Sequence, residues 1–383
     1  MRILFVVNFY PPQPWGTVAE RCQAMANYLD NNGHDLFILT GNYGVAEKDN
    51  KQLSVQKLMR FLKYVNYEHA GSYERWKVDK YNYHVTWQIA EEIMPDLTFF
   101  WDMDGISVAP VLAIQKLKIP KIFEVSKLWI DKYVHEDFIS RSKLKLKSFL
   151  PQTVGGKIDF NPSIVNSRRV EKELQLRYGL QRFYYLPVGV DIPSVVSLPD
   201  FGRSLKLISR WEIAENKNFT TIFIALQKLQ KQGIRFEYNL FGKLKPQLIY
   251  KLKKEIDHYG LGKEIHFHTQ QIDEDFCYEN NDIYLIPPGS VEIDLEILQA
   301  WANQRLLLIP EVATELKLSP GVDLLLYQDN LFEQLLAVAE DSSNARKIAA
   351  AGYQHVSQKY NLAKIMQQTA EILLKETMEQ KQK

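Results

Sequence analysis

The sequence predicts an α/β protein built from two Rossmann-like domains in tandem. The chain has 383 residues, enough for two domains of about 100–200 residues each. Short β-branched or aromatic runs alternate with helical patterns along most of it. The first run, Arg2–Asn8, has the composition of a strand buried on both faces of a parallel sheet. A helix opened by Thr17 and a strand at Leu36–Thr40 complete a βαβ unit, and such units build parallel sheets.

Further strands and helices continue this alternation, although residues 41–92 are less regular. A strand at Leu97–Trp101 is followed by a helix at Ile106–Lys116, and Asn166-Ser167 ends a short strand at a helix cap. The other strands are expected at Lys121–Val125, Tyr184–Val188, Leu205–Ser209, Phe236–Phe241, Ile265–His268, Ile283–Ile286 and Leu306–Ile309. The other helices are expected at Arg169–Arg177, Phe219–Lys231, Gln247–Tyr259, Leu295–Ala302 and Asn344–Lys375.

The composition of the sequence changes at residues 192–204, which are enriched in proline, serine and glycine. Such a stretch is typical of a linker, so we place an N-terminal domain at 1–192 and a C-terminal domain at 193–359. We expect the last helix, 360–383, to pack back on the first domain. Ligands of open parallel sheets bind beyond the carboxyl ends of the strands. Two such domains facing each other would therefore enclose a site in a cleft.

Composition argues against several classes of protein. Lys and Arg number 47 against 46 Asp and Glu, so no overall field favours nucleic acid. Cys22 and Cys277 lie far apart, which argues against disulfides and zinc and fits a reducing cytoplasm. Met1–Val7 is too short for a signal peptide, and the run Gly105–Gln115 is too short to span a membrane. We therefore expect a soluble cytoplasmic protein, or one held peripherally on the inner face of a membrane.

Several short motifs follow the predicted strands in a fixed order. They are Pro11-Pro12 with Gly16, Asn166-Ser167, Leu186–Asp191, Ser209-Arg210 with Lys217-Asn218, Asp282–Pro287, Gln299–Ala302 and Ala349–Gly352. In this order they resemble the motifs of the retaining GT-B glycosyltransferases of the large sucrose-synthase-like group 1 family, glycosyltransferase family 4. The resemblance covers nearly the whole chain. It implies the GT-B fold, in which two Rossmann-like domains face each other across a cleft.

The resemblance also implies a reaction. An enzyme of this family moves a hexose from a nucleoside diphosphate sugar to a hydroxyl acceptor with retention of configuration. A UDP-sugar, glucose in particular, is the donor expected from family frequency, and the acceptor would be a glycan or a lipid-linked molecule in polysaccharide or glycolipid biosynthesis. Neither a metal nor a cofactor is implied, and the oligomeric state stays open. The absence of G-x-G-x-x-G after the first strand argues against a Rossmann oxidoreductase.

The leaving diphosphate of such a donor needs fixed positive charge near it. Arg210 and Lys217 follow the first strand of the second domain and are the candidates for this role. From the residues alone, both could equally be exposed side chains of a loop. The resemblance adds three residues to the donor side: Gly16, Ser209 and Gly242.

The E-x7-E motif of the family corresponds to residues 290–299, but this chain departs from it. Gln299 stands at the second Glu, which contacts ribose in the family, and Val291 stands at the first. Glu292 or Asp294 could contact the donor sugar instead, or these acids could only stabilise the start of the next helix. The same segment supplies two further donor-side candidates, Leu295 and Glu296. The altered motif also raises an alternative function: a catalytically weakened relative that binds a ligand or stabilises a partner.

The acceptor side is expected at the strand ends of the first domain. The segment 101–104 contains D-x-D, which holds a metal in other transferase folds, but its place in this domain argues against a metal here. Asp102 could orient or deprotonate the acceptor hydroxyl, or it could simply end the strand. The other acceptor-side candidates are Trp15, Trp101, Asp104, Lys127 and Trp129.

Aromatic residues form 12% of the chain and gather at residues 61–87, interleaved with Lys and Arg. We interpret this stretch as part of an acceptor-binding region, with helical core packing as the rival explanation. The basic stretch 141–147 suits contact with anionic lipid, and a solvated surface is its alternative.

Overall fold

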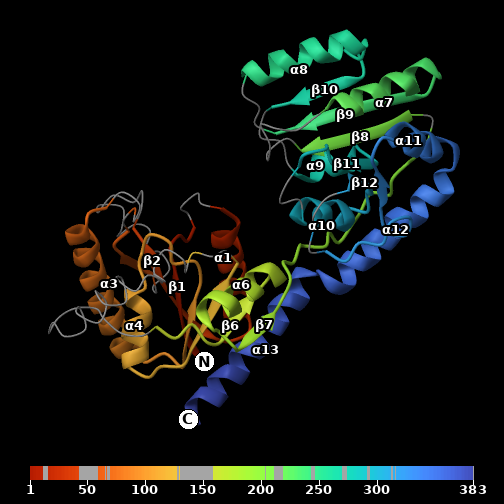
Figure 1. Ribbon diagram of the computed structural model, residues 1–383. Coiled ribbons are helices and arrows are strands. Elements are labelled where there is room, and N and C mark those ends of the chain that lie inside the picture. Colours follow the sequence, from red (N-terminus) through yellow and green to blue (C-terminus); the bar gives the residue numbers. More distant parts are fainter. Residues whose placement is uncertain are drawn as a thin grey trace. The chain divides into compact units, whose positions relative to one another are not determined.

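The computed structural model describes most of the chain. The described residues are 1–11, 16–42, 59–64, 66, 70–126, 129, 158–202, 204–210, 219–242, 246–269, 274–290, 294–311, 314 and 316–382. The chain divides into two compact units (Figure 1). Unit 1 comprises Met1–Pro187 and Met366–Lys383, and unit 2 comprises Val188–Ile365. The proline-rich stretch at 192–204 lies within unit 2, where Phe201 is buried in the core.

A parallel sheet of seven strands forms the centre of unit 1. The strands are β1 (Arg2–Val7), β2 (Asp35–Gly41), β3 (Met59–Leu62), β4 (Leu97–Phe100), β5 (Lys121–Val125), β6 (Ser163–Val165) and β7 (Phe183–Tyr185). Their order across the sheet is β3-β2-β1-β4-β5-β6-β7. This is the Rossmann order, and the ends of β1 and β4 flank its topological switch point.

Helices cover both faces of this sheet (Figure 1). They are α1 (Gly16–Asn31), α3 (Ser72–Ile93), α4 (Ala109–Lys116), α6 (Arg168–Tyr178) and α13 (Leu362–Lys381), which begins in unit 2 and continues into unit 1. Cys22 and Leu29 of α1 and Leu373 of α13 share one core cluster with the sheet. Helices α3, α4 and α6 contribute to the cluster on the other face.

Local sequence explains where some helices begin and end. The side chain of Ser167 caps α6, and Gly179 ends it in the left-handed region at φ +63°. Helix α4 begins three residues later than predicted, at Ala109. The reason is that Gly105 and Ser107 have φ values of +84° and +67°, which an α-helix does not accommodate.

Unit 2 repeats the architecture with a parallel sheet of six strands. The strands are β8 (Ser204–Arg210), β9 (Arg235–Phe241), β10 (Ile265–His268), β11 (Ile283–Leu285), β12 (Leu306–Pro310) and β13 (Leu325–Tyr327). Their order, β10-β9-β8-β11-β12-β13, is again the Rossmann order, with its switch point between β8 and β11. The prediction of two Rossmann-like domains is therefore confirmed.

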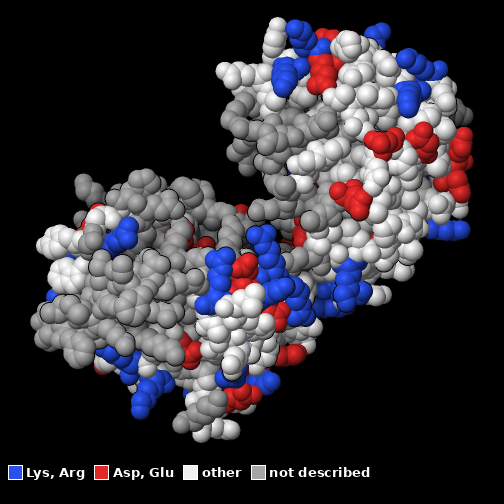
Figure 2. Space-filling model, viewed as in Figure 1, with Lys and Arg blue, Asp and Glu red and all other residues white. Residues whose placement is uncertain are grey.

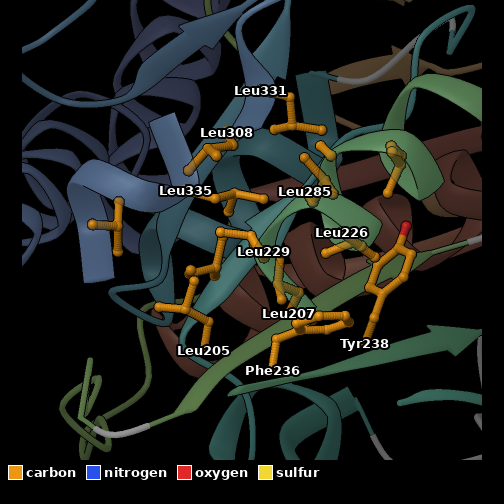
Figure 3. Close-up of a cluster of buried hydrophobic side chains, with 14 of the residues drawn as sticks. Leu205, Leu207, Leu226, Leu229, Phe236, Tyr238, Leu285, Leu308, Leu331 and Leu335 are labelled. Atoms are coloured by element: carbon orange, nitrogen blue, oxygen red, sulfur yellow. The ribbon is translucent and has the colours of Figure 1, made fainter. Parts of the chain in front are cut away.

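Two layers of helices enclose the second sheet. The helices are α7 (Thr220–Lys231), α8 (Pro246–Tyr259), α9 (Glu274–Glu279), α10 (Asp294–Ala302), α11 (Leu331–Glu340) and α12 (Ser342–Lys359). On one face, leucines of β8, α7 and α11 pack with Phe236 and Tyr238 of β9 in a single buried cluster (Figure 3). Helices α9 and α10 and the end of α12 contribute to the cluster on the other face.

Some elements were not predicted from the sequence: β3, α3, α9, β13 and α11. The helix expected at 344–375 is two helices. Helix α12 ends at its C-cap, Tyr360, and α13 begins at Leu362. In the described part of the chain, every helix is too short or too polar to cross a lipid bilayer.

Candidate functional site

The carboxyl ends of the unit 2 strands form the main candidate site. Strands β8 and β11 are neighbours where the strand order reverses, which is where Rossmann-like sheets bind ligands. Arg210 is the last residue of β8, Gly242 follows β9 and His268 ends β10. The sequence thus places a cation at the switch point itself.

Arg210 is held by a contact from α10. Its Nη1 donates to Oε1 of Gln299 at 3.0 Å, and both side chains are half-buried. A guanidinium oriented in advance can stabilise charge that develops on a ligand without reorganising during the reaction. The structure therefore brings together two residues that the sequence assigned to the donor side.

Glu296, also on α10, lies in the interior. It is 5% exposed, and the hydroxyl of Tyr284 on β11 donates to its Oε2 at 3.3 Å. Burial, followed by the neighbouring Tyr278 and Glu296, raises the pKa of Tyr284 well above its usual value, while the charge of Arg210 lowers it. The phenol thus keeps its proton, and Glu296 ties α10 to the sheet.

Ser209, also assigned to the donor side, is 1% exposed. Its hydroxyl lies 2.7 Å from the hydroxyl of Tyr238 and donates to the backbone carbonyl of Leu285. Burial raises the pKa of Tyr238, so that phenol is protonated as well. Ser209 joins β8 to both neighbouring strands and thereby fixes the strand end that carries Arg210.

Asp294 opens α10. Thr314 donates its hydroxyl to Oδ1 of Asp294 at 2.5 Å, and the same hydroxyl accepts from the backbone of Leu316 at 3.1 Å. Negative charge is favourable in the first turn of a helix. Leu295, the next residue, packs against the core cluster beneath α10. These contacts suit the stabilising role that the sequence left open for this acid.

Gly242 follows β9 at the same edge of the unit 2 sheet. Its φ of +131° lies in a region that favours glycine, and its N–H donates to the carbonyl of His268 at 3.1 Å. The ring of His268 stacks on Phe241 at 4.4 Å and bonds to Asn239 at 2.7 Å. Burial, and then the neighbouring His266, lower the pKa of His268, so the ring is mainly neutral at pH 7.

In unit 1, Asp102 and Asp104 lie in the turn after β4. Oδ1 of Asp102 accepts the backbone N–H of Asp104 at 2.9 Å. The carbonyl of Asp102 accepts from the backbone of Asn8, which follows β1, at 2.7 Å. Asp102 therefore closes a turn at the switch point of unit 1.

The two described tryptophans assigned to the acceptor side are both only 4% exposed. Trp101 packs against Phe99 with ring centres 4.9 Å apart, and Trp129 packs against Phe160 at 6.0 Å. Both rings therefore belong to the hydrophobic core of unit 1.

A partly buried ion pair close to Trp101 was not predicted. Nη2 of Arg21 on α1 lies 2.7 Å from Oε1 of Glu124 on β5, and the Glu124 side chain is 4% exposed. Arg21 also lies 6.0 Å from the centre of the Trp101 ring. Burial, and then the charge of Glu124, raise the pKa of Cys22, so its thiol keeps its proton. The signal in the sequence was weak because the partners stand 103 positions apart.

Four residues assigned to the site lie outside the described residues: Trp15, Lys127, Lys217 and Glu292. The basic stretch 141–147 does too, and Gly16 is the first residue of α1. Over the described ranges, no group of three or more His, Cys, Asp and Glu is placed to hold a metal ion. On the face shown in Figure 2, basic and acidic side chains are interspersed over each unit.

Comparison with solved protein structures identifies the fold of the chain. No family model and no curated protein matches the chain. A glycosyltransferase from Rickettsia africae matches with a TM-score of 0.67 and 16% identity over 98% of each chain. HepE of Anabaena, solved with UDP, matches with a TM-score of 0.67 and 15% identity over 98% of this chain and 100% of its own. Sucrose-phosphate synthase from Thermosynechococcus elongatus gives 0.64 and 13% over 97% and 98%. The chain thus has the GT-B fold of these glycosyltransferases, as the sequence predicted.

Proposed function

We propose that the protein is a retaining glycosyltransferase of family 4, which moves a hexose such as glucose from a UDP-sugar to a hydroxyl of a glycan or lipid-linked acceptor. The observation that carries the proposal is the contact of Arg210 with Gln299 at the switch point of a GT-B fold. HepE, which shares the fold, was solved with UDP-glucose, and WaaB, which also shares it, is a galactosyltransferase of the lipopolysaccharide outer core. The order of the sequence motifs supports the same reaction.

The proposed chemistry places positive charge where the leaving group forms. Negative charge grows on the diphosphate as the glycosidic bond breaks, and Arg210 would stabilise it there. By family resemblance, Lys217 shares this role, and Glu292 or Asp294 contacts the donor sugar. The departing phosphate takes the proton of the acceptor hydroxyl on the same face of the sugar. Configuration is then retained without a protein nucleophile.

On the acceptor side, we propose that the turn after β4 meets the acceptor. The half-buried Asp102 is a candidate to accept a hydrogen bond from the attacking hydroxyl. Its backbone carbonyl accepts from Asn8 and its Oδ1 accepts from the backbone of Asp104, and these contacts hold it at the end of the sheet, which is the edge where ligands of such sheets bind.

Calorimetric titration with UDP and UDP-glucose, together with an assay for released UDP, tests the proposal. Losing a hydrogen bond to a charged group costs about 1.5–3 kcal/mol, so Arg210→Ala should weaken UDP binding by about 10–100-fold. Arg235→Ala is the matched control, because Arg235 is exposed at the opposite end of the same sheet. The enzyme proposal fails if no UDP-, GDP- or ADP-sugar is bound or cleaved. The role of Arg210 fails if both variants bind UDP equally well.

One observation favours a second candidate, a relative that binds a nucleotide sugar without turning it over. Gln299 replaces the second Glu of the motif, while Glu296 is buried against Tyr284. This candidate predicts UDP-glucose binding without UDP release in the presence of hydroxyl acceptors. Under it, Gln299→Glu should restore UDP release, whereas an active enzyme would release UDP with Gln299 in place.

A further inference from the structure

Loops that follow neighbouring strands of unit 1 meet at the carboxyl edge of its sheet. Strands β3, β2, β1 and β4 lie side by side in that order. The loop after β4 reaches back over the end of β2, where a Cβ on Gly41 would lie 3.0 Å from Cγ2 of Ile106. There it meets the loop after β3, because the amide of Asn82 bonds to both loops. Ligands of Rossmann-like sheets bind at this edge.

Asn82 of α3 holds the two loops together. Its side chain is fully buried, and its Nδ2 donates to the carbonyls of Lys63 and Ile106, each at 2.8 Å. Its Oδ1 accepts the backbone N–H of Lys63 at 2.8 Å. A buried amide is costly unless it is hydrogen-bonded, and this one is bonded through both its oxygen and its nitrogen. The loop after β3 is therefore held in one place at the ligand edge.

The next residue of this loop is Tyr64, whose ring lies against the main chain of the turn after β4. Gly105 in that turn has φ +84°, and a Cβ there would overlap the Tyr64 ring. The ring also packs with that of Phe9, which follows β1, with ring centres 5.4 Å apart. The backbone N–H of Tyr64 donates to Oδ1 of Asn42, which follows β2, at 3.0 Å. Contacts with the loops of three other strands therefore fix the position of Tyr64.

Exposure separates Tyr64 and Phe9 from the core aromatics of the same edge. Both are half-buried, so part of each side chain reaches the surface. Trp101 and Trp129, which the sequence assigned to this edge, are only 4% exposed. Of these four side chains, Tyr64 and Phe9 are the two that a ligand at the edge can contact.

An aromatic ring beside carboxylates suits one class of ligand. Asp102 and Asp104 belong to the same turn as Gly105, against which Tyr64 lies. A sugar presents a face of C–H groups, which packs on an aromatic ring, and hydroxyl groups, which donate to carboxylates. A saturated acyl chain would bring no hydrogen-bond donor to these carboxylates. The combination therefore favours a sugar ring.

We propose that Tyr64 is a specificity-determining residue that stacks against a sugar ring of the acceptor, with Phe9 supporting the tyrosine ring. The hydroxyl that receives the hexose would then belong to a sugar, and a bare lipid or a simple alcohol would be a poor acceptor. The inference rests on the proposed function, which places the acceptor at the turn after β4. It adds the chemical class of the acceptor and the residue that recognises it.

Saturation-transfer difference NMR tests the proposal without requiring turnover. The chain, saturated with UDP, is mixed with the methyl glycosides of glucose, galactose and N-acetylglucosamine, and aromatic protons of the protein are irradiated. At least one glycoside should receive saturation at its ring C–H groups, whereas glycerol, which has hydroxyls but no ring, should not. Removing a contact over about 50 Å² of apolar surface weakens binding about tenfold, which is the loss expected for Tyr64→Ala.

Three further variants separate the ring from general effects on the fold. Tyr64→Phe keeps the ring and should keep the affinity. Tyr64→Leu keeps an apolar contact with Phe9 but removes the ring, and should behave like Tyr64→Ala. Tyr28→Ala is the matched control and should leave the affinity unchanged, because Tyr28 is half-buried near the end of α1, at the opposite end of the same sheet. Circular dichroism and the melting temperature check the fold of each variant.

Four results would each overturn the proposal. They are no saturation of any glycoside, equal saturation of glycerol, unchanged affinity in both Tyr64→Ala and Tyr64→Leu, and an equal loss in Tyr28→Ala. A loss in Tyr64→Phe as large as in Tyr64→Ala would also contradict it, because the contact would then belong to the hydroxyl group.

Calorimetry with the unaltered chain judges the proposed function separately. If UDP binds but no glycoside does, the acceptor class is refuted while the donor site stands. If none of the nucleotide sugars binds, the proposed function fails, and this inference fails with it.

Discussion

Gly352 lets α12 pack closely against Trp301 of α10, and replacing it tests that packing directly. A Cβ at this position of α12 would lie 2.3 Å from Cδ1 of Trp301, 2.5 Å from its Nε1 and 3.0 Å from the carbonyl of Asp323. Trp301 is fully buried on α10, and its Nε1 donates to that carbonyl at 2.8 Å. Since ordinary contact begins at 3.4 Å, the two helices would have to separate by about 1 Å.

The expected result of Gly352→Ala is a loss of stability. Alanine gains about 1 kcal/mol over glycine in a helix interior, whereas overpacking a core costs about 1–3 kcal/mol and displacing the indole hydrogen bond about 1 kcal/mol more. The net loss of about 1–3 kcal/mol should lower the melting temperature of unit 2 by about 3–10 °C. Differential scanning calorimetry measures it, because a chain of two units has no single free energy of unfolding.

Gly71→Ala is the matched control. Gly71 precedes α3 with φ −68°, and a Cβ there would meet nothing within 4 Å. We expect a change within about 0.5 kcal/mol. In a Trp301→Leu background, Gly352→Ala should cost less, because the clashing indole is gone. An unchanged or higher melting temperature for Gly352→Ala alone would refute the reasoning, and so would an equal cost in both backgrounds.

Two further predictions concern buried carboxyl groups. Glu376 of α13 is fully buried and accepts from Arg182 at 2.7 Å and from Tyr184 at 2.6 Å. Glu376→Ala should lower the free energy of unfolding of unit 1 by about 2–3 kcal/mol in urea, a moderate loss because Arg182 is partly exposed. An unchanged unfolding midpoint would contradict a stabilising role for Glu376. Burial raises the pKa of Asp282 above its ordinary 3.8, so the charged form lowers stability as pH rises above that value. Asp282→Asn, which keeps an oxygen for the N–H of Asp200 at 2.8 Å, should raise the melting temperature at pH 7 but not near pH 4, and an equal gain at both values would contradict the assignment.

The sequence predicts the sheets well because their strands are short, continuous apolar runs, which only a buried position tolerates. It left a helix at residues 61–87 only as a rival explanation and gave no bounds for α3. The outer face of that helix carries Tyr73, Trp76 and Tyr81, so aromatic residues occur on both sides and hide the helical period. The same difficulty affects Trp101 and Trp129, whose burial depends on neighbours far away in the sequence. Aromatic content alone therefore could not separate surface from core.

For the candidate site too, the sequence predicts local features but not contacts between distant residues. Arg210 was predicted from the end of a strand, which is a local feature, whereas its contact with Gln299 joins residues 89 positions apart. That contact gives Gln299, which stands at the second Glu of the E-x7-E motif, a role in orienting Arg210. Oε1 of Gln299 accepts from Arg210, and the remaining amide nitrogen can only donate. Under the proposed function, a ribose hydroxyl at this position would meet a neutral amide, whose Oε1 keeps a second lone pair, where the resemblance implies a charged carboxylate. Because Gln299 is neutral, it orients Arg210 without cancelling its charge, so diphosphate binding should be maintained while ribose contacts weaken. UDP and inorganic pyrophosphate should therefore differ less in affinity for this chain than for its Gln299→Glu variant.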